Sequence, residues 1–167
     1  MSRLKKYIFS GIIFVIIAGT ISHFVYEWSG RSFLLSFFFP VNESTWEHMK
    51  LCFFPMLLYG IFMNHKLKKT FPCITSALCF GVLLDTFLIP VIFYTYSGIL
   101  GRNFLSLDIA TFIFSTICAF WTVYRFTLSC KLVPYTPWLK LFVALTALCF
   151  FIFSCKAPGI GLFRDSH

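Results

Sequence analysis

Pro40-Val-Asn-Glu-Ser-Thr-Trp-Glu-His-Met-Lys50 interrupts a chain that is otherwise strongly apolar. This short stretch carries two carboxylates, an imidazole, an ammonium group and a tryptophan, between a Phe-rich run and a long apolar segment. The pattern predicts the start of a helix that brings polar side chains into an apolar surrounding. We expect the rest of the chain to be a scaffold that brings a few further polar groups to the same place.

The composition on both sides of this stretch is that of a membrane protein. Of the 167 residues, 59% are hydrophobic and only 12% are charged, whereas soluble chains carry about 25% charged residues. The 24 phenylalanines exceed what the interior of a soluble fold of this size could cover. The sequence therefore predicts a single integral membrane domain over residues 1–167.

Five segments approach the length of about 20 mostly apolar residues that a membrane-spanning helix needs. The predicted spans are 7–28, 46–64, 71–94, 104–125 and 138–155. The run Ser32–Phe39, between the first two, is too short to cross, so we expect an interfacial or re-entrant segment there. The predicted fold is an all-α polytopic bundle of five transmembrane helices.

The basic residues favour one orientation in the membrane. With the N-terminus inside, nine of the fourteen Lys and Arg residues fall on the cytoplasmic side, as the positive-inside rule predicts for an N-in, C-out protein. The net charge of +8 comes from residues that flank apolar segments, so it indicates membrane lipid and not nucleic acid as the partner. The seven cysteines show no CxxC spacing and lie mostly in apolar segments, which favours small core residues over disulfides.

Two acidic residues flank the predicted start of the second helix. Ser44 and Glu47 have the spacing of a capping box, which would satisfy exposed backbone N–H groups at the helix start. Alternatively, Glu43, Glu47 and Lys50 lie at i, i+4 and i+7, which would form one stripe that binds a cation or moves a proton.

Histidines supply a second set of candidate ligands. His23 and Glu27 share a face of the first predicted span, and His48 lies in the first turns of the second. Two imidazoles with a carboxylate suit a divalent metal such as Zn²⁺, and we expect His23, His48 and Glu47 as its ligands. The structural alternative is a His–Glu hydrogen bond that joins two helices.

Asp85 is a carboxylate in the middle of a predicted span. Such a group faces a cavity or a partner, and Lys50 is the counter-ion closest in depth; a neutral, protonated Asp85 is the alternative. Asp108, in contrast, is interpreted as a charge at a helix start. All six acidic residues, with His23 and His48, fall in the outer half of the predicted topology or beyond it.

Three of these strings resemble a family of small bacterial membrane proteins known as domain of unknown function 6512. The similar strings are 23–30, 40–50 and 89–101. The resemblance implies a multi-pass fold and a bacterial source, and hence the bacterial cytoplasmic membrane, but no activity.

Three classes of function are compatible with these residues. The first is a catalytic or ligand-binding centre for a lipid-linked or small amphiphilic substrate. In it, Glu43 or Glu47 acts as general base, His48 and His23 carry protons or bind metal, and Lys50 binds an anion. Glu27 and Asp85 are further candidate ligand-binding residues.

The second class is an accessory or partner-binding membrane protein in which the polar cluster is a structural clamp. The third, a transporter or channel, ranks lowest because no ionisable residue lies in the inner half of a predicted span.

Overall fold

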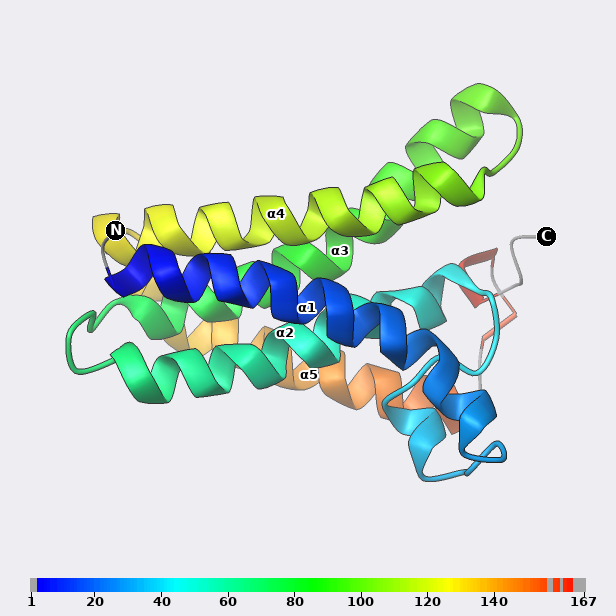
Figure 1. Ribbon diagram of the computed structural model, residues 1–167, viewed down its shortest axis with the longest axis horizontal. Coiled ribbons are helices and arrows are strands. Elements are labelled where there is room, and N and C mark those ends of the chain that lie inside the picture. The colour runs from blue at the N-terminus through cyan, green and yellow to red at the C-terminus, as the bar shows by residue number, and fades with distance from the viewer. Residues whose placement is uncertain (1–2, 156–157, 160, 164–167) are drawn as a thin grey trace.

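Five long helices run back and forth along one axis in the computed structural model, which describes residues 3–155, 158–159 and 161–163 (Figure 1). They are α1 (Arg3–Trp28), α2 (Thr45–Leu67), α3 (Ile74–Leu100), α4 (Leu105–Ser129) and α5 (Thr136–Cys155). Short 3-10 turns form at η1 (Leu35–Phe37), η2 (Val133–Tyr135) and η3 (Gly161–Phe163). The prediction of an all-α protein with five long helices is confirmed.

Four segments are long and apolar enough to cross a membrane: α1, α3, α4 and the stretch Val133–Cys155 that contains α5. The second predicted span, 46–64, is not among these four, because α2 does not reach this level of hydropathy. Polar residues occupy both of its ends, with Glu47 and Lys50 near the start and Asn64 and Lys66 near the end. Because α1 and α3 pack against α2, most of its residues are buried among other helices, and α2 needs no apolar exterior.

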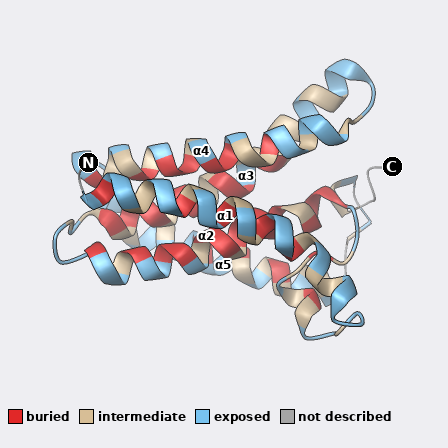
Figure 2. Ribbon diagram, in the orientation of Figure 1, coloured by how far each residue is buried: buried red, intermediate tan, exposed pale blue. Residues whose placement is uncertain are grey.

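The core lies along the middle of the bundle, where buried residues concentrate (Figure 2). Gly81 of α3 permits a close helix approach, because a Cβ there would lie 2.4 Å from Cγ2 of Val123 on α4. Gly19 of α1 does the same, with a Cβ 2.7 Å from the carbonyl oxygen of Leu51. Large side chains at these two positions would push the helices apart.

The C-terminal part of α3 and the N-terminal part of α4 project beyond the other helices (Figure 1). Gly101, in the left-handed region with φ 70°, ends α3, and its N–H donates to the carbonyl of Ser97 at 2.8 Å. The opposite end of the bundle carries the N-terminus and the α2–α3 connection (Figure 1).

The segment between α1 and α2 is a compact turn. Its η1 turn packs against α1 and α5, whereas Phe33 and Leu34 are exposed. A short segment that does not cross the bundle is thus found where the sequence predicted one.

A disulfide joins Cys73 and Cys130, and the expectation of no disulfide was wrong. Cys73 directly precedes α3 and Cys130 directly follows α4. Because α3 and α4 are packed neighbours, residues 57 positions apart come together. Local sequence spacing cannot reveal such a pairing.

Candidate functional site

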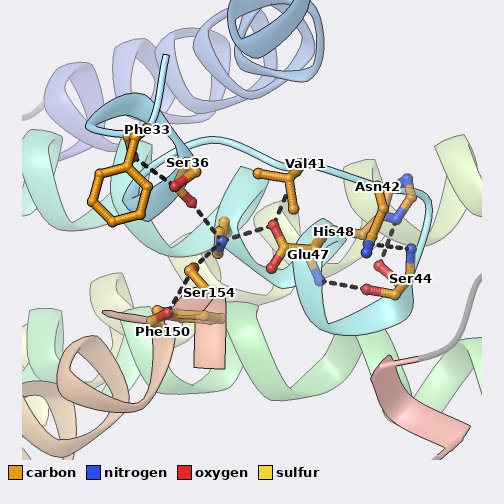
Figure 3. Close-up of polar contacts among 10 residues, drawn as sticks. Phe33, Ser36, Val41, Asn42, Ser44, Glu47, His48, Phe150 and Ser154 are labelled. Atoms are coloured by element: carbon orange, nitrogen blue, oxygen red, sulfur yellow. Dashed lines mark hydrogen bonds and ion pairs between the residues drawn. The ribbon is translucent and has the colours of Figure 1, made fainter. Parts of the chain in front are cut away.

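Residues at the start of α2 and just before it form the hydrogen bonds that fix the start of the helix (Figure 3). The Ser44 hydroxyl accepts from the Glu47 N–H at 3.4 Å, as the capping-box pattern predicts. The return bond differs from the pattern, because the Glu47 carboxylate accepts from the N–H of Val41 at 3.0 Å. Ser44 N–H donates instead to the Asn42 side chain at 3.1 Å.

Glu47 also belongs to a buried ion pair. Lys50 is fully buried, and its Nζ lies 2.7 Å from Glu47 Oε2. Lys50 Nζ also donates to the Ser36 carbonyl at 2.9 Å and to the Ser154 hydroxyl at 2.7 Å. An ammonium has three donors, so each has an acceptor, and the group ties η1 and α5 to α2. We call these residues the Lys50 network (Figure 3).

A separate group of three side chains lies at the junction of α1 and the start of α2. His23 Nε2 is 3.6 Å from Glu43 Oε1, and His48 Nε2 is 3.3 Å from Glu43 Oε2. One ligand atom from each of the three residues lies within 4.8 Å of the others. We call this group the His–Glu–His trio. All three side chains are partly exposed.

The ring of His48 is held in one orientation. Its Nδ1 lies 2.9 Å from the carbonyl oxygen of Ser44, and because a carbonyl can only accept, Nδ1 carries the hydrogen. In the neutral ring, Nε2 then presents a lone pair to the Glu43 carboxylate, so a proton or a cation is needed between them. Metal-binding histidines show the same arrangement, with one ring nitrogen donating to a backbone carbonyl.

Two predicted members of this cluster lie elsewhere. Glu27 pairs with Arg31 at 3.2 Å between Oε1 and Nε, and both side chains are exposed. Glu47, the predicted carboxylate ligand, lies in the Lys50 network, and Glu43 occupies the place next to both imidazoles.

The trio borders a cavity of about 140 Å³ between the α1–α2 junction and the α3–α4 pair. The lining residues come from the α1–α2 side and from the α3–α4 side: His23, Glu43, Thr45, His48 and Leu51, and Ile89, Phe93, Leu105, Asp108, Thr111 and Phe112. Leu105 is 76% exposed, so the cavity reaches the outer surface of the bundle at the start of α4.

Asp85 lies outside this cavity, in the core. It is fully buried, one helical turn before the lining residue Ile89, and Thr116 Oγ1 lies 3.4 Å from its Oδ1. Among the described residues, no hydrogen-bond partner reaches its Oδ2. None of the ion pairs in this part of the chain joins it to Lys50, so the predicted pairing of these two residues is not found.

Asp108 is the residue whose place the sequence did not reveal. It lies in the first turn of α4, as expected, but its side chain lines the cavity and accepts a hydrogen bond from the Tyr96 hydroxyl of α3. Only the packing of α3 on α4 brings these two side chains together. The single hint in the sequence is that Asp108 is acidic in an otherwise apolar segment.

Four apolar segments of spanning length indicate a multi-pass membrane protein. The chain belongs to the family described as "Family of unknown function (DUF6512)", whose model matches residues 1–167. No curated protein matches the chain, and no solved structure does either.

Proposed function

We propose that the His–Glu–His trio binds a divalent cation such as Zn²⁺. A tetrahedral zinc ion with bonds of about 2.0–2.1 Å has ligand atoms roughly 3.3 Å apart. Each Glu43 oxygen lies near this distance from one imidazole, with Oε1 3.6 Å from His23 Nε2 and Oε2 3.3 Å from His48 Nε2. Imidazole and carboxylate are ligands that suit zinc. Three protein ligands leave a fourth position for water or a bound molecule. The fixed orientation of His48 is the observation that carries this proposal.

The size and lining of the cavity favour an amphiphilic molecule as the ligand of this centre. Its volume of about 140 Å³ is below the roughly 300–1,000 Å³ of sites that enclose a whole drug-sized molecule. It therefore suits a polar head group and not a complete lipid. Leu105 on its wall is an exposed apolar residue at the start of α4, along which an acyl or alkyl chain would lie in the bilayer. The proposed role is a binding or catalytic centre for a lipid-linked or small amphiphilic molecule.

The proposed setting is the bacterial cytoplasmic membrane, crossed five times, with the N-terminus inside and the C-terminus outside. The central place of α2 between α1 and α3 supports a fifth crossing that other helices shield from lipid. The basic excess on the side of the N-terminus supports the orientation. The cavity then opens toward the outer leaflet.

A structural role is favoured for the Lys50 network. Its ammonium has three acceptors and no exposed surface, so no donor remains for an anionic ligand. Under this proposal Glu47 and Lys50 clamp η1, α2 and α5 together, and the chemistry belongs to the trio. The structural-clamp alternative therefore applies to the Lys50 network and not to the His–Glu–His trio.

Zinc binding by the purified, metal-free protein tests the proposal. We expect one ion per chain and about a 100-fold or larger loss of affinity in His48→Ala and in His23→Ala, because each removes a ligand. His65→Ala is the matched control, since His65 is an exposed histidine near the other end of α2. Absence of zinc from the wild-type protein, or equal affinity in the His48→Ala and His65→Ala variants, would contradict the proposal.

A further inference from the structure

The cavity beside the trio carries two carboxylates, one in the trio itself and one on the α3–α4 side. Glu43 and Asp108 are its carboxylates, and His23 and His48 its imidazoles. Among the described residues, no Lys or Arg lines it. A phosphate or sulfate head group would find two carboxylates and no Lys or Arg there, which disfavours anionic heads.

Asp108 is placed to receive a positive charge. It lies in the first turn of α4, at the positive end of the helix dipole. The Tyr96 hydroxyl donates to its Oδ1, which fixes the orientation of the carboxylate. None of the ion pairs within the described ranges involves Asp108, so its charge has no cationic partner in this part of the chain.

The surroundings of Asp108 also fit an ammonium group. Phe93 of α3 and Phe112 of α4 line the same cavity, and aromatic faces attract cations. The exposed Leu105 lies one turn before Asp108 on α4, at the place where the cavity reaches the outer surface. A head group beside Asp108 can thus have its chain on the apolar exterior.

We propose that the cavity recognises amphiphiles with a positively charged amine head, that Asp108 binds the amine, and that Tyr96 is a positioning residue for Asp108. The ligand class rests on the proposed function, because it assigns the amphiphile to the same cavity. Binding of the amine to Asp108 does not require the metal, since Asp108 lies on α4 and the trio belongs to α1 and the start of α2.

Three probes of equal chain length test this: dodecylamine, dodecanol and dodecyl phosphate. Their binding is measured by scintillation proximity on the purified full-length protein, with and without zinc. We expect the wild-type protein to bind the amine about tenfold or more tightly than the alcohol, the size of one charge-assisted hydrogen bond. The phosphate should bind more weakly than the amine.

Asp108→Asn should lose this preference while its affinity for dodecanol and for zinc stays unchanged, and retained zinc binding shows that the variant is folded. Tyr96→Phe should weaken amine binding by a smaller factor, and it carries the test if Asp108→Asn does not fold. Glu27→Gln, which removes an exposed carboxylate elsewhere, is the matched control.

An amine affinity that is equal in the wild-type protein and in Asp108→Asn would overturn the inference, as would tighter binding of the phosphate in zinc-free protein. The two proposals fail separately. If the wild-type protein prefers the amine but does not bind zinc, only the metal site is refuted. If it binds zinc but does not prefer the amine, only the ligand class is refuted.

Discussion

The Lys50 network and the His–Glu–His trio both draw on residues 43–50, yet they differ in burial and in the side chains they bring together. In the network, a fully buried ammonium has an acceptor for each donor. In the trio, the half-exposed Glu43 lies within 3.6 Å of both imidazoles, and the Ser44 carbonyl fixes the ring of His48. A fully paired buried charge holds a fold together, whereas partly exposed imidazole and carboxylate groups beside a cavity are typical of a binding site.

The largest effect on stability is expected at Lys50. Lys50→Met leaves the buried Glu47 without its partner, and such changes cost about 3–5 kcal/mol. The free energy of unfolding in detergent measures the loss. The double variant Glu47→Gln with Lys50→Met should recover much of it, because no buried charge then remains. A single variant as stable as the wild-type protein would show that the network does not clamp the helices.

Glu43 should behave in the opposite way. Glu43→Gln removes the charge between the imidazoles, so zinc affinity should fall about 10- to 100-fold. The free energy of unfolding should change by no more than about 0.5 kcal/mol, as for surface substitutions in general. A large loss of stability with unchanged zinc affinity would instead make the trio a second clamp and remove the contrast between the two groups.

The number of helices and the polar character of this region could be predicted from the sequence, but not which carboxylate joins the histidines. The predicted stripe placed Glu43 and Glu47 on one helix face. However, α2 begins at Thr45 with Ser44 as its N-cap, so Glu43 precedes the helix and is free of its 100° periodicity. Glu47 is inside the helix, where the Val41 N–H and Lys50 hold it.

The other differences come from tertiary packing. The place of Asp108 on the cavity wall and the pairing of Cys73 with Cys130 both depend on how α3 lies against α4. The lower hydropathy of α2 also follows from packing, because its neighbours α1 and α3 provide the apolar exterior.

Ser44 contacts both groups, and a substitution there tests a smaller effect on stability. Its hydroxyl caps α2 next to Glu47, while its backbone carbonyl orients His48. Ser44→Ala removes only the hydroxyl, so the free energy of unfolding should fall by about 1 kcal/mol. Zinc affinity should stay the same, because the carbonyl remains. A parallel loss of zinc affinity would show that the cap and the trio are one unit.

The end of the bundle that carries the N-terminus and the α2–α3 connection lies opposite the trio (Figure 1), so its location decides which compartment the trio faces. Two signals about that location disagree. The basic residues favour a cytoplasmic location, whereas the Cys73–Cys130 disulfide is typical of an oxidising compartment. With the N-terminus inside, both cysteines would face the cytosol, which keeps thiols reduced, so the disulfide itself tests this orientation.

Single-cysteine variants report the orientation directly. Cys155, an exposed residue at the end of α5, lies at the opposite end of the bundle and should react with a membrane-impermeant maleimide added to intact cells. Cys73 and Cys130 should react only with a permeant one. The reverse pattern would make the disulfide the reliable signal, place the N-terminus outside, and turn the cavity with its trio toward the cytosolic zinc pool.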